Sequence, residues 1–351
     1  MSEGAAVPSF FVGSYTATGG GNATGISLVQ DGVASTVAVM DDPSFLAVAG
    51  DRVYAVSEVV DGSVSAFRRN GSALEHLWDA PAGGDAPCHV RVDAAGVLVL
   101  TNYTSGTVTA VGLDGAGAAG ACAGSAGAGA AATAVLPDVT GPDPDRQDGP
   151  HAHQSIATPE GTILVADLGG DALHEFAVSG SGSGSGSGSS SVGLSSVRVH
   201  HVAPGAGPRH MAWFDGDLFV AGELDGQVHR LRRDNSGSFR TVASAGTGSV
   251  VPGDSLLSHI EVDDAGRVVV AVRGRDEIAV LDAADGGLTF MGAVPCGGTW
   301  PRHFARVPGF LLVANERSDA VAVLPVGDDG MPGEPVGQIA VGTPTCVVPL
   351  S

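Results

Sequence analysis

Short apolar stretches recur along the whole chain, each followed by a turn rich in glycine, aspartate or serine and then by a second apolar or alternating stretch. This pattern is typical of β-hairpins, because successive side chains of a strand point to opposite faces. Long stretches with the 3.6-residue period of an amphipathic helix are missing, so we expect an all-β fold. The seven hairpin copies are FFVGSYT (10–16), RVYAVSEVVDGSVSAF (52–67), VLVLTNYTSGTVTAV (97–111), TILVADLGGDALHEF (162–176), DLFVAGELDGQVHRL (217–231), RVVVAVRGRDEIAVL (267–281) and FLLVANERSDAVAVL (310–324).

A second short element precedes most of these hairpins. Its copies are PSFL (43–46), PCHV (87–90), HAHQ (151–154), PRHM (208–211), SHIE (258–261), PRHF (301–304) and PTCV (344–347). The last copy has no hairpin after it, and the N-terminal hairpin has no such element before it. We therefore predict that the C-terminal element completes the blade begun by the N-terminal strands, which gives a closed seven-bladed β-propeller of four-stranded antiparallel blades.

The end of the first hairpin strand marks the repeat. The marker residues are Ser14, Ser57, Asn102, Asp167, Gly222, Val272 and Asn315. Consecutive markers are 43 to 65 residues apart, which suits propeller blades. The two longest spacings contain low-complexity segments near 113–150 and 179–191, which we expect to be flexible inserts within a single domain of residues 1–351. An open array of β-sandwiches, or two domains, is the structural alternative.

Charge narrows the range of partners. The chain has 38 acidic and 17 basic residues, a formal net charge of -21, and every basic residue is arginine. Such a surface repels nucleic acid and anionic membranes, so we expect neither as a partner. We predict a cytoplasmic protein, because no basic leader or membrane-spanning stretch is evident. We further expect a monomer or weak oligomer. The acidic composition also suggests a cytosol of high ionic strength, although GC-rich coding equally favours arginine over lysine.

One register of the second element is expected to line the central channel of a propeller. It holds Phe45, His89, His153, His210, His259, His303 and Cys346. Five of the 11 histidines therefore fall at one structural position, and His151 precedes this register by two residues. The imidazoles are either hydrogen-bonded spacers in a narrow channel or parts of a functional pocket.

Charged residues occupy the adjacent registers. Arg209 and Arg302 directly precede ring histidines. The position after the marker holds Glu58, Tyr103, Glu223, Arg273 and Glu316. Both positions lie near one mouth of the expected channel, so we predict an anion site with a titratable base beside it. For Arg275 and Arg317, inside the turns, surface ion pairing is the simpler interpretation.

As a set, these motifs resemble the seven-bladed lactonase family, which contains bacterial propeller-type 6-phosphogluconolactonases and fungal carboxymuconate lactonizing enzymes. The likeness extends over nearly the whole chain apart from the inserts. The motifs that carry it are FVGSYT, PCHVRVDAAGVLVLTNYTSGTV, GPRHMAWF, VAGELDGQV, VAVRGRDEIAVLD, PRHFARVPGFLLVANERSDAVAV and PTCVV. The resemblance implies an enzyme that hydrolyses a small anionic lactone, 6-phosphogluconolactone to 6-phosphogluconate, with neither a cofactor nor a metal ion.

The resemblance also implies a site. A histidine, two arginines and a glutamate form the proposed catalytic set of the fungal branch, and by motif they correspond to His153, Arg209, Arg273 and Glu223. Substrate-binding residues are predicted at His89, His151, His210, His259, Arg302, His303 and Tyr103. A carboxymuconate-type cycloisomerase that uses the same residues, and a propeller that serves as a non-enzymatic binding scaffold, remain the alternatives. The long insert directly before His151 leaves the size of the substrate open.

Overall fold

The computed structural model describes residues 7–113, 131–180, 192–248 and 255–350. The tracts 114–130 and 181–191, which belong to the predicted inserts, lie outside the described residues. In the described ranges the strands form seven four-stranded antiparallel sheets, and the one helical element is a short 3-10 turn, η2 (Glu316–Ser318). The predicted all-β class with seven four-stranded blades is confirmed. No helix in these ranges has the length and hydropathy needed to cross a membrane.

The blades fall into two compact units. Residues 42–204 form a three-blade unit, and residues 1–41 together with 205–351 form a four-blade unit. The strands of the three-blade unit are β4 (Leu46–Ala49), β5 (Arg52–Ser57), β6 (Ser63–Asn70) and β7 (Ala73–Pro81); β8 (Pro87–Val92), β9 (Val97–Asn102), β10 (Thr107–Gly112) and β11 (Ala131–Val135); β12 (Ala152–Ala157), β13 (Ile163–Asp167), β14 (Ala172–Ser179) and β15 (Gly193–His201).

Three blades of the four-blade unit are also continuous in sequence. Their strands are β16 (Pro208–Phe214), β17 (Asp217–Gly222), β18 (Gln227–Arg233) and β19 (Phe239–Gly246); β20 (Leu256–Val262), β21 (Arg267–Arg273), β22 (Glu277–Asp282) and β23 (Thr289–Pro295); β24 (Pro301–Val307), β25 (Phe310–Asn315), β26 (Ala320–Pro325) and β27 (Gly337–Ala340).

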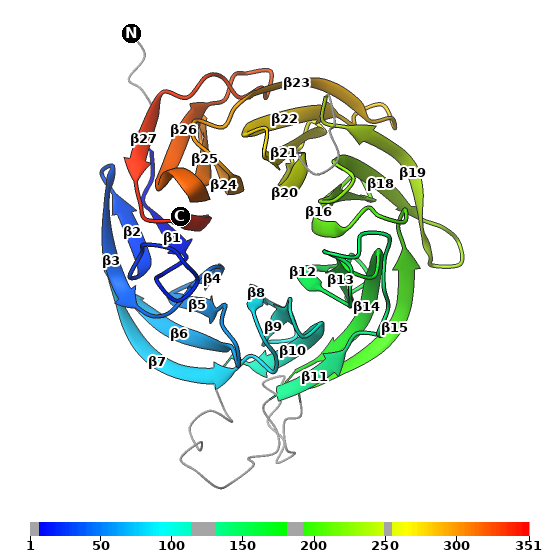
Figure 1. The fold of residues 1–351 in the computed structure, drawn as a ribbon, viewed down its shortest axis with the longest axis horizontal. Helices are drawn as coiled ribbons and strands as arrows, with labels where there is room; N and C mark the ends of the chain where they lie inside the picture. The colour runs from blue at the N-terminus through cyan, green and yellow to red at the C-terminus, as the bar shows by residue number, and fades with distance from the viewer. Residues whose placement is uncertain (1–6, 114–130, 181–191, 249–254, 351) are drawn as a thin grey trace, which may run out of the picture. The chain divides into compact units, whose positions relative to one another are not determined.

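The fourth blade of this unit joins the two ends of the chain. Strand β28 (Pro344–Pro349) pairs with β1 (Phe10–Ser14), which is followed by β2 (Gly25–Gln30) and β3 (Val33–Val39). In the register of this pair, Phe10 lies opposite Pro349 and Gly13 lies opposite Cys346. Figure 1 shows the C-terminus beside blue β1. The predicted pairing of the two unmatched sequence elements is therefore confirmed.

Burial explains why the second strand of each blade is an almost continuous apolar run. Every residue of β9 (VLVLTN) and β17 (DLFVAG) is buried, because such strands are covered on both faces. In the four-blade unit, for example, Phe219 and Ala221 of β17 pack in one cluster with Leu257 and Val268 of the following blade. The outermost strands, such as β3 and β15, instead carry many exposed residues.

The first hairpin strand ends at the predicted marker in six blades and one residue later, at Arg273, in the seventh. In five blades the strand before this one, which is the first of the blade in sequence, carries a ring histidine. The pairing of these strands shifts register between Pro87 and His89 and again between Pro301 and His303. Each shift is a β-bulge or a similar irregularity, which disturbs the regular alternation of side chains at this point. The repeat therefore positions the ring residues on irregular rather than ideal strands.

Part of the first predicted insert is described and has defined contacts. Residues 131–135 form β11, the outermost strand of its blade. Farther along, the buried Gln147 side chain donates hydrogen bonds from Nε2 to the carbonyl oxygen of Leu168 (2.9 Å) and to Asp171 Oδ1 (2.8 Å). The backbone of Gly141 also donates to the carbonyl oxygen of Gln147 (2.9 Å). These contacts hold the segment that leads to His151 against its own blade.

Candidate active site

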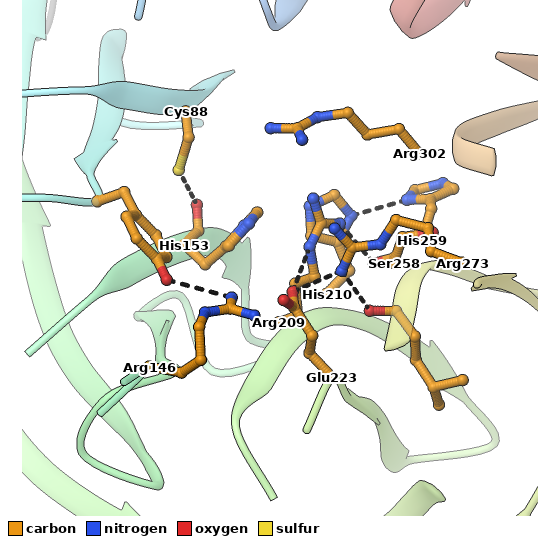
Figure 2. Close-up of polar contacts among 12 residues, drawn as sticks. Cys88, Arg146, His153, Arg209, His210, Glu223, Ser258, His259, Arg273 and Arg302 are labelled. Atoms are coloured by element: carbon orange, nitrogen blue, oxygen red, sulfur yellow. Dashed lines mark hydrogen bonds and ion pairs between the residues drawn. The ribbon is translucent and has the colours of Figure 1, made fainter. Parts of the chain in front are cut away.

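The four-blade unit contains a buried cluster of two arginines and one glutamate. Glu223 Oε2 lies 3.0 Å from Arg209 Nε and 2.8 Å from Arg273 Nη2, and all three side chains are less than a tenth exposed. Dashed lines in Figure 2 connect Glu223 to both guanidinium groups. Arg209 comes from β16, Glu223 directly follows β17, and Arg273 ends β21 of the next blade. Two cations on one carboxylate leave the cluster with a formal charge of +1.

Backbone carbonyl groups fix the two arginines. Arg209 Nη1 donates to the carbonyl oxygen of Ser258 (2.6 Å), and Arg273 Nη2 donates to that of Leu257 (3.3 Å). The Ser258 hydroxyl in turn donates to the carbonyl oxygen of Pro301 (2.7 Å), which ties β20 to β24. Arg273 Nε is buried and makes no hydrogen bond with any residue that the structure describes. A buried donor without a partner is costly, so this one is well suited to a ligand.

Three ring histidines lie beside this cluster. His210 Nδ1 is 2.8 Å from His259 Nδ1, and the His259 and His303 rings stack with centroids 3.9 Å apart. His303 Nδ1 accepts the Val347 N–H (3.4 Å). Burial, assisted by the charge of Arg209, lowers the pKa of His259 to about 3. Burial, with His259 and Arg209, also lowers the pKa of His303 well below its ordinary value, so both imidazoles are neutral at pH 7.

Glu261 follows His259 by two residues on β20. Its Oε1 lies 3.4 Å from His259 Nε2, and its Oε2 lies 3.4 Å from Arg306 Nε. Burial raises the pKa of Glu261 to about 7, although Arg306 opposes this rise. The sequence analysis did not single out this residue, yet its position two residues beyond the ring register is the signal that could have found it.

A second arginine–glutamate pair occupies the equivalent positions of another blade. Arg302 Nη1 lies 3.1 Å from Glu316 Oε2, and Arg302 Nη2 donates to the Tyr15 hydroxyl (2.6 Å). The Arg302 and Glu316 side chains are 17% and 15% exposed. Tyr15 directly follows the marker Ser14, so the repeat register could have predicted its position.

Trp300 is another residue that the sequence analysis missed. The Arg273 guanidinium carbon lies 5.5 Å from the centroid of its indole ring, and that of Arg317 lies 3.5 Å away. Trp300 precedes the PRHF element and belongs to neither register considered in the sequence analysis. The surface ion pairing expected for Arg317 is replaced by this contact with an aromatic face, whereas Arg275 does pair with Glu277 (2.5 Å).

The three-blade unit groups two further predicted residues, His151 and His153, around Tyr103. Its ring stacks on His151, with centroids 4.5 Å apart, and meets His153 edge-on at 5.8 Å. His151 Nδ1 lies 3.1 Å from the Tyr103 carbonyl oxygen and Nε2 lies 3.1 Å from Asp148 Oδ1. Arg146, from the described part of the insert, donates to the Tyr103 hydroxyl (3.4 Å), a contact drawn in Figure 2.

The backbone of His153 is also held in place. Its carbonyl oxygen accepts hydrogen bonds from the Thr101 hydroxyl and from Cys88 Sγ (3.4 Å), both on the neighbouring blade of the same unit. The His89 ring packs against Phe45 in a tilted arrangement, with centroids 4.5 Å apart. Across the described ranges, no group of three or more histidine, cysteine, aspartate or glutamate side chains is arranged to hold a metal ion.

The structure thus brings three of the four predicted catalytic residues, Arg209, Glu223 and Arg273, into direct contact. His153 is on β12 of the three-blade unit, together with Tyr103 and His151. Among the predicted substrate-binding residues, His210, His259 and His303 form a second group, and Arg302 pairs with Glu316. The catalytic and binding roles assigned to these residues stay predictions.

Comparison with known proteins decides the family. The family model described as lactonase, 7-bladed beta-propeller, matches residues 9–349. The chain belongs to this lactonase family. The predicted resemblance is therefore confirmed over almost the entire chain.

Individual relatives of this lactonase are similar over most of their length. The chain is 33% identical over 332 residues to a 6-phosphogluconolactonase of Bacillus subtilis, and the match covers 88% of each chain. A crystal structure of a Lactobacillus plantarum protein shares 25% identity at a TM-score of 0.82, covering 98% of this chain and 99% of that one. A periplasmic gluconolactonase of Pseudomonas aeruginosa has a TM-score of 0.77 at 22% identity, covering 99% of each chain, which shows the common fold.

Proposed function

We propose that this lactonase hydrolyses a sugar lactone, 6-phosphogluconolactone, to 6-phosphogluconate. The observation that carries the proposal is the buried Arg209–Glu223–Arg273 cluster, which has one positive charge in excess. In this cluster Arg273 Nε is a buried N–H donor that has no partner among the described residues. Family membership and the 6-phosphogluconolactonase of Bacillus subtilis support the reaction class.

Arg273 has the chemistry to polarise the lactone carbonyl. Attack of water on the carbonyl carbon places negative charge on its oxygen, and a fixed guanidinium stabilises that charge without having to reorganise. The Leu257 carbonyl and Glu223 contact Arg273 through Nη2, which leaves the buried Nε to donate to the lactone. Arg209 shares Glu223 and adds a second positive charge beside the same carboxylate.

His153 and Glu223 differ in what they are able to do. Glu223 Oε2 already accepts two guanidinium groups, which suits a residue that positions Arg209 and Arg273. The acid–base step that the sequence predicts for His153 stays a prediction: such a group takes a proton from the attacking water and returns one to the departing ring oxygen. The bond from carbonyl carbon to ring oxygen breaks, and the product is a carboxylate with a free hydroxyl.

Replacing Arg273 tests this function. Arg273→Ala should lower kcat/KM for 6-phosphogluconolactone by roughly 100-fold or more, because a donor to the oxyanion is lost. The rate is measured as proton release above the spontaneous hydrolysis of the lactone. Arg275→Ala, two residues away and engaged with Glu277, is the matched control and should retain full activity. Lactone turnover by Arg273→Ala at the wild-type rate would remove the assignment.

The same assay separates the alternatives. A carboxymuconate-type enzyme would interconvert a muconate and its lactone, which is followed by ultraviolet absorbance, and would leave sugar lactones untouched. A non-enzymatic scaffold would act on neither compound. Turnover of the phosphorylated lactone with no change in muconate absorbance is the result expected here.

Three further expectations are kept as proposals. The first is that the substrate is a small anion, because a cluster of formal charge +1 lies in a chain of net charge -21. The excess of acidic residues and the absence of lysine favour a cytoplasm of high ionic strength. We also propose a monomer or weak oligomer, which light scattering across a range of salt concentrations would test.

A further inference from the structure

Trp300 adopts a backbone conformation that large residues avoid. Its φ is +65°, in the left-handed region, where a bulky side chain is a genuine outlier. Trp300 directly precedes the proline of the PRHF element. The residue at the equivalent position also has a positive φ in four other blades, where it is Asp42, Ala86, Gly207 or Thr343. Tryptophan is thus the one large aromatic residue among these five equivalent positions. Strain of this kind is commonly retained where function needs it.

The indole ring of Trp300 connects two arginines of the four-blade unit. Arg273 lies over the ring at 5.5 Å and Arg317 at 3.5 Å from its centroid. The backbone secures this arrangement, since Trp300 N–H donates to Asp276 Oδ1 (2.7 Å) and its carbonyl oxygen accepts the Glu316 N–H (3.1 Å). Arg317 therefore shares its aromatic support with the arginine that we assign to the lactone carbonyl.

Arg317 also keeps its charge uncompensated. It is exposed, and it forms no ion pair with any carboxylate in the described part of the chain. The acidic residues of the same turn have other partners: Glu316 pairs with Arg302, and Asp319 accepts from Asn22 Nδ2 (2.8 Å). An unpaired guanidinium is notable in a chain where acidic residues outnumber arginines by 38 to 17.

We infer that Arg317, seated on Trp300, binds the phosphate group of the substrate and selects the phosphorylated lactone over the plain one. This inference rests on the proposed function and deepens it. Guanidinium groups bind phosphate oxygens through two parallel N–H donors, and stacking on an indole pre-orients that planar group. Arg273 then serves the carbonyl end of the lactone and Arg317 serves its phosphate, with Trp300 between them.

Comparing two lactones tests the inference. Arg317→Gln should lower kcat/KM for 6-phosphogluconolactone roughly 10- to 100-fold, mainly through KM, because one charge-assisted contact is lost. Turnover of glucono-δ-lactone, which has no phosphate, should stay at the wild-type value. Arg275→Gln is the matched control, because it removes the same charge from another turn, and it should alter neither substrate.

The outcomes separate this inference from the proposed function. Equal loss on both lactones, or no loss on either, overturns the role of Arg317 while leaving lactone hydrolysis in place. If the wild type hydrolyses neither lactone, the proposed function fails, and calorimetry with 6-phosphogluconate and gluconate decides the inference alone. Tighter binding of 6-phosphogluconate that Arg317→Gln abolishes supports it. Equal affinity for the two acids overturns it.

Trp300 provides an independent arm. Trp300→Phe keeps an aromatic face and should retain most of the preference for the phosphorylated lactone. Trp300→Gly removes the ring and at the same time suits the left-handed backbone, as Gly207 does at its own position. A folded Trp300→Gly protein, checked by circular dichroism, should lose the preference about as strongly as Arg317→Gln. Full preference in Trp300→Gly contradicts the platform role.

Discussion

Two arginine–glutamate pairs occupy the same repeat positions in different blades of the four-blade unit, yet their surroundings differ. In each pair the arginine precedes a ring histidine and the glutamate follows the marker 14 residues later, as in Arg209–Glu223 and Arg302–Glu316. The first pair is 3% exposed on both sides, and the second is 17% and 15% exposed. The next blade adds a cation, Arg273, to the first pair and a hydroxyl, Tyr15, to the second.

The difference shows how a repeat acquires an active site. A buried ion pair is costly to desolvate and depends on further hydrogen bonds, two of which the Ser258 and Leu257 carbonyl groups accept here. The residue directly after the marker of the neighbouring blade is Arg273 beside the first pair and Tyr15 beside the second. The arginine makes the first arrangement positively charged, whereas the tyrosine leaves the second neutral. The same backbone scaffold thus presents one charged and one neutral version of the same arrangement.

The largest expected effect comes from neutralising each glutamate in turn. Glu223→Gln leaves two buried guanidinium groups without their counter-charge and should lower the free energy of unfolding by about 3–5 kcal/mol. It should also reduce kcat/KM roughly 100-fold, because both arginines lose their position. Glu316→Gln should cost about 1 kcal/mol or less. Urea denaturation and lactone kinetics measure both variants, and equal effects would erase the distinction between the pairs.

A smaller effect is expected from the second pair's hydroxyl partner. Tyr15→Phe removes the hydrogen bond from Arg302 and should weaken substrate binding about 5-fold, the equivalent of roughly 1 kcal/mol for one net hydrogen bond. The change should appear in KM and leave kcat and thermal stability nearly unaltered. Tyr54→Phe, in the three-blade unit, is the control for loss of a tyrosine hydroxyl elsewhere. An unchanged KM in Tyr15→Phe would mean that the second pair does not contribute to the substrate site.

A pH effect separates the two pairs as well, because burial, assisted by the charge of Arg209 in the first pair, lowers the pKa of His259. That pKa is about 3 in the folded protein, below the ordinary value of 6.5, so protonation favours the unfolded chain. The stability that His259 contributes is present above pH 6.5 and is lost as pH falls towards 3. Denaturation at pH 7, 6, 5 and 4 should therefore show a shallower acid loss in His259→Asn than in the wild type.

Glu261 acts in the opposite direction. Its pKa of about 7 lies above the ordinary 4.5, so its contribution is present below pH 4.5 and is lost as pH rises through 7. Glu261→Gln should therefore lessen the loss of unfolding free energy as the pH rises from 5 to 7. Identical slopes in wild type and His259→Asn would contradict the assignment of the acid loss to His259.

The repeat predicted most of the fold because its signals are local. Strand ends coincide with Ser14, Asn102 and Asn315 because a buried strand must stop where the chain turns out of the core. The register shifts could not be predicted, since a bulge inserts a residue without changing the hydrophobic pattern. Strand β11 was also missed, because its Ala/Thr sequence follows a Gly/Ala tract and is mostly exposed on its blade.

The site was only partly predictable. Registers indicated Arg209, Glu223 and Arg273, because equivalent positions of neighbouring blades converge. Trp300 and Arg146 lie outside those registers, in connecting segments whose position depends on tertiary contacts rather than on periodicity. The carbonyl groups that hold the arginines carry no sequence signal, since every residue has one.

The pairing of β1 with β28 has a consequence for synthesis. Phe10 and Phe11, both fully or almost fully buried in the finished molecule, leave the ribosome long before their partners Pro349 and Val348 exist. Until then the edge of β1 presents unpaired backbone groups and apolar side chains, a template on which a second nascent chain can add a strand. Messages truncated before residue 344 should therefore yield aggregating rather than merely inactive protein.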